Sequence, residues 1–516
     1  MGSTMNRPVA AGFRGAIRTA IAAGTAFLAI TAACARGDAG RPPVGARTRA
    51  PGPDVATIVK PPDPAPAVDF THVSRLINDA IAANRLPGAV VVIGHGGKVA
   101  FHQAYGSRKL AGEPGLDGLP APAEPMTEDT IFDLASLTKS LATATAVMQL
   151  YQQGKVAFDD PVQQYLPDFN TVNDPRRAKV TVRMLLTHTS GETGDVNLGD
   201  PWGLDKADKE EGLHRALTTP LESAPGQAFR YSDINFILLG ALIEKATGEA
   251  LDVYVQRQVF EPLGMADTHY LPPAQACGPH TTLGAAVAWA PAPQDQAPDA
   301  CPVGSWNAGL LPRIAPTARD EEGRADPGKN PDLDHLLRGT VQDTTARRMG
   351  GVAGHAGVFS TAHDVGIFAQ ALLDRLAGRP SQFPLTQTTL ETMTSPQQPG
   401  HTLEQLKAAN AAARAAIAKR PNRADPLLAP RYPAIAGQNL RGFGWDIDTG
   451  QSAPRGVVFP IGSFGHTGFT GTSVWMDPSS DTYVVVLSNS IHTRGSPPVS
   501  DLRGEIATAA AQALGL

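Results

Sequence analysis

Ser136 and Lys139 are the first residues whose types and spacing indicate chemistry. They stand in the segment Ser136-Leu137-Thr138-Lys139, the only S-x-x-K in the chain of 516 residues, and a mostly small or apolar segment follows. Residues three apart lie on one face of a helix, so the Lys139 amine can reach the Ser136 hydroxyl. Because a serine needs a neighbour to remove its proton, the pair indicates acyl transfer through Ser136. Taken alone, the motif also fits a capping serine beside a solvated lysine.

Two residues are candidates for the general base. Lys139 would serve in a desolvated site at a helix N-terminus, where burial lowers the pKa of an amine. Tyr231 lies just before a predicted helix, and a tyrosine beside a cation can accept or relay a proton. In the same segment, Asp233 or Asn235 can hold a lysine or a substrate amide. The alternative for this segment is a helix N-cap next to a packed aromatic ring.

A third element is Gly465-His466-Thr467-Gly468-Phe469, which precedes strand-like residues near the C-terminus. Its glycines let a backbone come close to a ligand, and exposed amides at a strand edge can bind an oxyanion. We therefore assign substrate or oxyanion contacts to four residues: His466, Thr467, Gly468 and Phe469. A glycine-kinked strand without function is the alternative.

In this order, the three elements resemble the S-x-x-K, Y-x-N and K/H-T-G motifs of serine β-lactamases and low-molecular-mass penicillin-binding proteins. That family includes class C β-lactamases, streptomycete-type D,D-peptidases and family VIII carboxylesterases. The resemblance extends to residues 181–191, 260–265 and 350–357, and covers about 70–516 apart from 291–332 and 403–418.

The resemblance implies a role for each matching residue. Ser136 would be acylated, Lys139 and Tyr231 would handle protons, and the backbone amides of Ser136 and Phe469 would form the oxyanion hole. Neither a cofactor nor a metal is implied, and the histidines outside the motifs show no zinc-like spacing. His188 is assigned a structural role.

Two departures from the family pattern change these expectations. Asp233 stands where the motif usually has Asn, so a charged acceptor replaces an amide donor and could hold Lys139 protonated, which shifts the role of base to Tyr231. His466 replaces the lysine common in β-lactamases, as in streptomycete-type D,D-peptidases. Since an imidazole changes charge near pH 6.5, we expect His466 to bind the carboxylate of a D-alanyl peptide more tightly in acid, with Arg230 as the alternative cation.

The expected function is that of an exported serine hydrolase that acts through a Ser136 acyl-enzyme on D-alanyl peptides of the peptidoglycan. A carboxylesterase or a weak β-lactamase is the enzyme alternative. A penicillin-binding sensor module, acylated at Ser136 without turnover, is the alternative from another class. The net charge of -5 gives no excess of basic residues for a nucleic-acid partner.

The elements that must position these residues come from both ends of the chain. A helix from residue 69 is followed by strands at 89–93 and 99–101, and strands at 474–476 and 483–487 precede a helix at 501–514. Helical segments are expected at 141–150, 182–186 and 236–246. The fold class is therefore α/β (α+β), with an antiparallel sheet flanked by helices (about 68–135 and 345–516) and an inserted, mainly helical part (about 136–344).

The N-terminal residues predict export. Arg7, Arg14 and Arg18 precede an apolar run, so residues 1–35 are interpreted as a signal peptide. Its end, at Cys34, matches either a lipoprotein box, with membrane attachment through a lipidated Cys34, or an ordinary cleavage site. The Pro-, Gly- and Ala-rich residues 36–67 are interpreted as a linker.

Cys277 and Cys301 are expected to form a disulfide in an oxidising compartment, with two free thiols as the alternative. Residues 291–332, rich in Pro and Asp, and 403–418, rich in Ala, are predicted to be excursions from the compact fold. The hydrolase domain itself is assigned to residues 68–516.

Overall fold

The computed structural model describes residues 68–283, 286–289, 301–302, 304–398, 408, 411 and 439–516. All of them belong to one compact unit, Pro66–Leu516. The predicted signal peptide, Cys34, the linker and almost all of the excursion at 403–418 lie outside the described residues. None of the described helices combines the length and apolar character needed to cross a bilayer.

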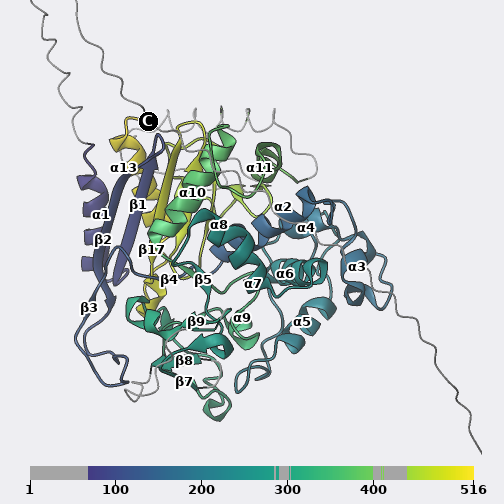
Figure 1. Cartoon of the computed structure of the whole chain (residues 1–516), viewed down its shortest axis with the longest axis horizontal. Coiled ribbons are helices and arrows are strands. Elements are labelled where there is room, and N and C mark those ends of the chain that lie inside the picture. Colours follow the sequence, from purple (N-terminus) through teal and green to yellow (C-terminus); the bar gives the residue numbers. More distant parts are fainter. Residues whose placement is uncertain are drawn as a thin grey trace, which may run out of the picture. The chain divides into compact units, whose positions relative to one another are not determined.

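An antiparallel sheet of eight strands combines the two ends of the described chain (Figure 1), in the order β13-β14-β15-β16-β17-β1-β2-β3. The strands from the N-terminal side are β1 (Gly88–His95), β2 (Lys98–Lys109) and β3 (Glu124–Pro125). Those from the C-terminal side are β13 (Leu440–Arg441), β14 (Asp446–Asp448), β15 (Phe464–Thr467), β16 (Ser473–Asp477) and β17 (Thr482–Ser488). β1 pairs with β17 from Ala89↔Ser488 to His95↔Thr482, so the predicted sheet built from both ends is confirmed.

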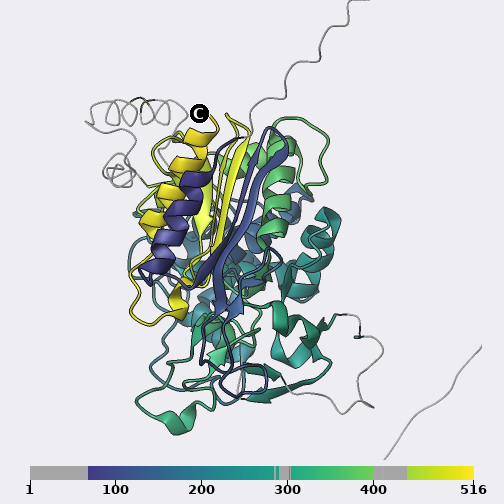
Figure 2. The same cartoon turned by 90° about the vertical axis from the view of Figure 1, so that its left-hand side faces the viewer.

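Helices cover both faces of this sheet, which explains why β1 is apolar and buried up to Gly94. Helices α1 (Thr71–Ala82) and α13 (Ser500–Ala513) lie on one face, and α10 (Ala362–Leu376) lies on the other (Figure 2). Successive strand residues point to opposite faces. Val91 and Ile93 accordingly pack into the core with α1 and α13, whereas Val90 and Val92 belong to the core that contains α10.

The predicted helical part lies beside the sheet. The helix expected at 141–150 begins with a π-helical turn, Lys139–Ala144, and continues as α2 (Thr145–Gln152). The other helices of this part are α3 (Val162–Tyr165), α4 (Val182–Leu186), α5 (Lys209–Thr218), α6 (Asp233–Thr247), α7 (Leu251–Val255) and α8 (Glu261–Leu263). The segments predicted at 182–186 and 236–246 are therefore helical.

Between α8 and α10 the chain forms mostly short strands and 3-10 turns, so the expectation of a mainly helical part as far as residue 344 is wrong. The paired strands are β4 (Phe132–Asp133) and β5 (His269–Tyr270) with β12 (Val358–Ser360), β6 (Ala276–Cys277) with β9 (Trp306–Asn307), β7 (His280–Leu283) with β8 (Ala286–Trp289), and β10 (Ala318–Arg319) with β11 (Leu336–Leu337). Helix α9 (Thr344–Arg348) precedes α10 in the chain, and helix α11 (Gln387–Thr394) follows it.

Residues 304–332 pack into the fold, contrary to the expected excursion. The indole of Trp306 donates a hydrogen bond to the Pro272 carbonyl at 2.9 Å, and Leu311 is buried. Asp320 is also buried. Its carboxylate accepts hydrogen bonds from Arg347 and Asn330, each at 2.7 Å, which offset the cost of removing it from water. These ion-pair and amide partners explain how an Asp-rich segment can be compact. A disulfide joins Cys277 to Cys301, where the structure brings their Cα atoms to 5.6 Å.

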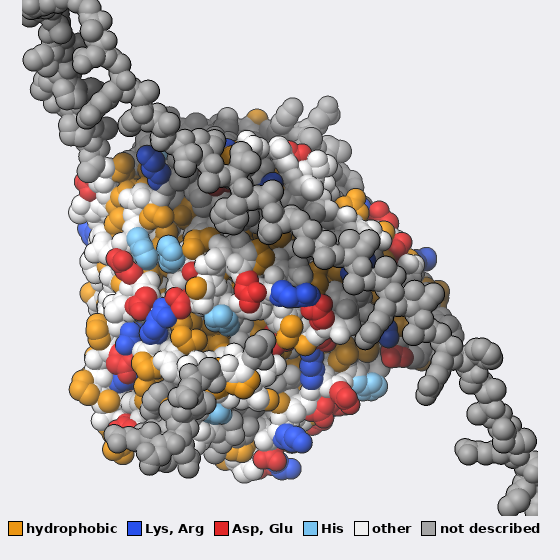
Figure 3. Space-filling model, viewed as in Figure 1, with side chains coloured by type: hydrophobic (Ala, Val, Ile, Leu, Met, Phe, Trp, Pro, Cys, Tyr) orange, Lys and Arg blue, Asp and Glu red, His pale blue; other side chains and the backbone are white. Residues whose placement is uncertain are grey.

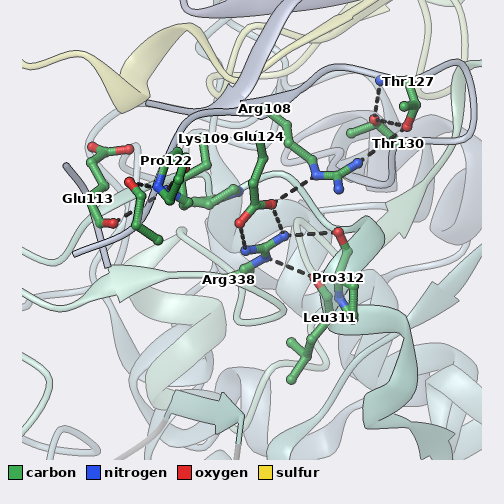
Figure 4. Close-up of polar contacts among 12 residues, drawn as sticks. Arg108, Lys109, Glu113, Pro122, Glu124, Thr127, Thr130, Leu311, Pro312 and Arg338 are labelled. Atoms are coloured by element: carbon green, nitrogen blue, oxygen red, sulfur yellow. Dashed lines mark hydrogen bonds and ion pairs between the residues drawn. The ribbon is translucent and has the colours of Figure 1, made fainter. Parts of the chain in front are cut away.

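Buried and partly buried charges tie the edge of the sheet to this segment (Figure 4). The Glu124 carboxylate lies between Arg108, at 3.0 Å, and Arg338, whose closer contact is 2.6 Å. The ammonium of Lys109 is fully buried and donates to backbone carbonyls that include Pro122 at 2.8 Å and Leu110 at 3.1 Å. The chain between β2 and β3 is thereby fixed to Arg338, which also donates to the carbonyls of Leu311 and Pro312.

Candidate active site

Ser136 lies where strand β4 turns into the first helix of the helical part. Ala135, just before it, has a positive φ of 47°, a conformation that costs energy for a residue other than glycine and is held by its surroundings. The Asp133 side chain accepts the amides of Ala135 at 2.9 Å and Gln342 at 2.8 Å. Burial raises the pKa of Asp133 to about 6, although these hydrogen bonds oppose the rise. The turn leaves Ser136 partly exposed between buried neighbours.

Lys139 is fully buried, and its ammonium makes three short contacts. Nζ lies 2.9 Å from Ser136 Oγ, 3.0 Å from the His355 carbonyl and 2.6 Å from Asp233 Oδ1. Burial by itself would lower the pKa of Lys139, but its interactions with Asp233 and Tyr231 together outweigh burial and raise that pKa above its usual value. Lys139 is therefore a cation at neutral pH, and it is not available as the resting base.

Tyr231 lies on the other side of Lys139. The Lys139 Nζ is 5.0 Å from the centre of the phenol ring. The His188 ring stacks on the phenol, with centroids 4.4 Å apart, and the His188 Nδ1 accepts the Ser232 amide at 3.1 Å. His188, which we had assigned a structural role, thus fixes both the ring of Tyr231 and the backbone that follows it.

Asn235 does not face the nucleophile. Its side chain is fully buried, accepts a hydrogen bond from Ser190 Oγ at 2.5 Å and lies 3.3 Å from His188 Nδ1. Of the two residues predicted to hold a lysine or a substrate amide, Asp233 contacts Lys139, whereas α6 turns Asn235 toward the residues that support His188. Arg230, the alternative cation for a substrate carboxylate, forms an ion pair with Glu222.

His466 lies on β15 opposite Val474 and is 1% exposed. Its Nδ1 donates to the Thr467 carbonyl at 2.8 Å. Burial, together with the nearby cations Arg441 and Lys139, lowers the pKa of His466 well below its usual value. The expectation that His466 gains a proton between pH 8 and pH 5.5 is therefore wrong, because a buried imidazole between two cations stays neutral.

The loop after β15 packs against the residues before the nucleophile. Thr470 Oγ1 donates to the Asp133 carbonyl at 2.8 Å, and Thr472 Oγ1 donates to the Leu134 carbonyl at 3.0 Å. A Cβ atom on Gly468 would lie 2.4 Å from the Leu134 carbonyl oxygen, so only glycine permits this approach. Thr467, at the end of β15, is partly exposed.

Two backbone amides are free to bind an oxyanion. Within the described part of the chain, the amides of Ser136 and Phe469 have no hydrogen-bond acceptor. The close packing of Gly468 on Leu134 brings the segments that carry them together. Two preorganised amide donors beside a nucleophile are what the tetrahedral intermediate of acyl transfer requires.

Sequence reasoning did not assign a role to Arg441 or to a His–Asp pair behind Lys139. Arg441 is fully buried on β13, and its Cζ lies 5.9 Å from the centre of the Tyr231 ring. His355, whose carbonyl binds Lys139, has Nε2 2.8 Å from Asp343 Oδ1. The glycine-rich segment around His355 carries part of the family resemblance and could have indicated a role near the site. Nothing in the sequence near Arg441 indicates a contact with Tyr231.

A cavity of about 380 Å³ opens beside Phe469. Its charged lining residues are Arg319, Arg347 and Arg494 with Asp320, Glu321 and Glu322. Several come from residues 304–332, the segment expected to lie outside the compact fold. On the face drawn in Figure 3, basic and acidic side chains of the described residues are likewise interspersed.

Comparisons with known proteins identify the family of this chain. A "Putative D-alanyl-D-alanine carboxypeptidase" of Escherichia coli (strain K12) is 27% identical over 427 residues, 80% of each chain. An "N-acetylmuramyl-L-alanine amidase" of Bacillus subtilis (strain 168) is 29% identical over 433 residues, 82% of this chain and 81% of the relative. The class C β-lactamase structure from Rhodobacter sphaeroides has the same fold, with a TM-score of 0.53 and 17% identity over 86% of this chain and 100% of that one. Because the Beta-lactamase family model matches residues 73–507, the chain belongs to that family of serine hydrolases.

Proposed function

We propose that this chain is an exported hydrolase that cleaves D-alanyl peptides of the cell wall through an acyl-enzyme on Ser136. One observation carries the proposal: Ser136 Oγ lies 2.9 Å from the Lys139 ammonium, next to two amides that have no acceptor among the described residues. A hydroxyl in this setting can attack a carbonyl carbon, and the two amides can stabilise the negative charge that develops on the carbonyl oxygen.

The residues divide the proton transfers among them. Tyr231 takes the Ser136 proton as Oγ bonds to the carbonyl carbon, and the amides of Ser136 and Phe469 bind the oxyanion. The leaving amine then takes the proton from Tyr231 as the C–N bond breaks. Water then attacks the resulting ester and gives a proton to Tyr231, and Tyr231 returns that proton to Ser136 Oγ as the ester C–O bond breaks and the acid leaves. Lys139, held by Asp233, remains a cation throughout and orients Ser136 Oγ.

The cavity beside Phe469 favours a peptide over a small apolar ester. Its arginine and carboxylate side chains offer partners to charged and hydrogen-bonding groups, and a short acyl chain would bury none of them. The name of the Escherichia coli relative supports a D-alanyl peptide as substrate.

Steady-state assays on four substrates test this function. The substrates are a peptide ending in D-Ala-D-Ala, p-nitrophenyl acetate, nitrocefin and a muramyl-L-alanine amide, which the name of the Bacillus relative suggests. We expect the highest kcat/KM on the D-Ala-D-Ala peptide and none in Ser136→Ala. Preference for the muramyl amide or the ester would refute the proposed substrate, and release of one equivalent without turnover would indicate a sensor module.

Export is tested separately with the full chain. The arginine-flanked apolar N-terminus supports it. We expect the protein outside the cytoplasm, and the membrane-bound fraction to be lost in Cys34→Ala if a lipid is attached there. Recovery of the full-length, unprocessed chain in the cytoplasm would refute export.

A further inference from the structure

Five charged or titratable side chains face the Tyr231 phenol or its nearest cation. Lys139 Nζ lies 5.0 Å from the ring centre, and the Arg441 Cζ lies 5.9 Å from it. The rings of His188 and His466 have centroids 4.4 Å and 6.1 Å from that of Tyr231. Asp233 contacts Lys139 rather than the phenol. These groups come from five separate parts of the chain, so the surroundings of Tyr231 are assembled only by the fold.

Among these groups, Arg441 is the cation whose charge is least balanced. The Lys139 ammonium is paired with Asp233 at 2.6 Å. Burial and the neighbouring cations lower the pKa of both His188 and His466 well below the usual value, so both are neutral. Among the described residues, the acid that forms an ion pair with Arg441 is Asp446, at 3.5 Å, and the other Asp446 oxygen accepts a hydrogen bond from Ser452.

The guanidinium of Arg441 also lacks hydrogen-bond partners. Its side chain is fully buried, and its Nε and Nη2 have no acceptor among the described residues. An incompletely paired charge in a medium of low dielectric acts strongly on nearby ionisable groups. The phenol of Tyr231 is such a group, and its negative form would repay part of the cost of burying Arg441.

We propose that Arg441 stabilises the phenolate of Tyr231 and so sets the pH above which the general base is active. The inference rests on the proposed role of Tyr231 as the base. Arg441 is 0% exposed, so it touches no substrate and acts as a positioning residue. Tyr231 releases its proton to solvent in the resting enzyme, and the resulting phenolate later accepts the proton of Ser136.

The pH dependence of kcat/KM on p-nitrophenyl acetate tests the inference. This neutral ester needs no carboxylate binding, so the proposed peptide specificity does not enter the result. In Arg441→Met we expect the acid limb of the profile to move up by about one pH unit, which lowers kcat/KM about tenfold on that limb. Arg441→Lys keeps the charge and should restore most of the wild-type profile.

Arg348→Met is a matched control. Arg348 is also buried, lies over an aromatic ring (5.5 Å from Trp202), has one acid partner (Glu322) and has an Nε without an acceptor among the described residues. The Arg348→Met variant should lose stability as Arg441→Met does, but its kcat/KM should keep the wild-type pH dependence. An unshifted acid limb in folded Arg441→Met would refute the inference. So would a loss confined to the KM of a carboxylate-ended peptide, which would make Arg441 a substrate anchor.

A spectroscopic titration tests the same inference without an Arg441 variant. The ultraviolet phenolate signal of the wild type, minus that of Tyr231→Phe, isolates one tyrosine. We expect this difference to titrate below the usual tyrosine range, and to do so in Ser136→Ala as well. Titration at or above the usual range would overturn the role of Arg441, whatever the substrate is.

Discussion

The exchange Asp233→Asn separates the two candidates for the base. In the wild type, Asp233 Oδ1 lies 2.6 Å from Lys139 Nζ, and the ammonium is fully buried. At this separation the Coulomb energy is about 6 kcal/mol for an effective dielectric constant of 20. An opposite charge this close typically shifts a pKa by about 1–3 units. Asparagine removes that attraction and keeps an oxygen for the hydrogen bond.

The direction of the change follows from burial. Without the Asp233 charge, burial is left as the largest influence and lowers the pKa of Lys139. Lys139 should then lose its proton at an alkaline pH where the wild type keeps it. Because the cation orients Ser136 and supports the Tyr231 phenolate, kcat/KM of Asp233→Asn should fall about tenfold per pH unit on this new alkaline limb. The wild-type profile should stay level over the same interval.

The assay is hydrolysis of p-nitrophenyl acetate between pH 6 and pH 10. Circular dichroism at each pH checks that the variant stays folded, since breaking a buried ion pair costs about 3–5 kcal/mol. Asp364→Asn, a buried aspartate bonded to Thr268, controls for the loss of a buried charge elsewhere. A rate of Asp233→Asn that rises with pH through the alkaline interval in which the wild-type profile is level would mean that neutral Lys139 is the base, and the assignment to Tyr231 would be wrong.

Other residues give further predictions. In Gly468→Ala a Cβ would meet the Leu134 carbonyl at 2.4 Å and displace the oxyanion loop, so kcat should fall about 100- to 1000-fold without loss of the fold. Burial raises the pKa of Glu192 to about 7, so folding favours its protonated form. The free energy of unfolding should therefore drop between pH 5 and pH 8 by roughly 3 kcal/mol more in the wild type than in Glu192→Gln, where other buried acids such as Asp133 still titrate. Lys109→Met leaves buried carbonyls without their donor and should lower that free energy by about 3 kcal/mol in chemical denaturation, unless water replaces the ammonium. Because His466 is neutral, the ratio of kcat/KM for a carboxylate-ended peptide to that for its amide should be level between pH 8 and pH 5.5, and a rise in acid that is absent from His466→Asn would contradict this.

Local sequence patterns were sufficient for the regular elements and for the nearest catalytic contact. The helix from residue 69 and the apolar run at 89–93 have the periodicities of α1 and β1, because covered faces select apolar residues at fixed spacing. The three-residue spacing of Ser136 and Lys139 likewise fixes their contact within one helical turn. Such features depend on neighbours in the chain, so a single sequence contains them.

The remaining features depend on contacts between distant segments. Arg441 is 210 positions from Tyr231 in the printed sequence, and no local pattern indicates that β13 buries its guanidinium near that ring. Residues 304–332 have the composition of an irregular excursion, yet the Arg347–Asp320 ion pair at 2.7 Å makes the segment compact. From its residue type alone, His466 would be expected to gain a proton near pH 6.5. Its pKa is lower because the fold buries it near Arg441 and Lys139, and the sequence does not show this.

The charges around Ser136 restrict where a substrate carboxylate can be bound. Lys139 is paired with Asp233, His466 is neutral and Arg441 is fully buried, so none of the three offers a free cation to a peptide terminus. Arg319, Arg347 and Arg494 line the open cavity beside Phe469, and the contact of Arg319 with Glu113, at 3.8 Å, is the loosest of their ion pairs. A carboxylate bound there would lie near Phe469, and Tyr231 is not among the residues that line this cavity. Recognition of a D-alanyl peptide by this chain would accordingly depend on the segment containing residues 318–322 and on the loop that carries Arg494, and the proton transfers would be insulated from the charge of the substrate.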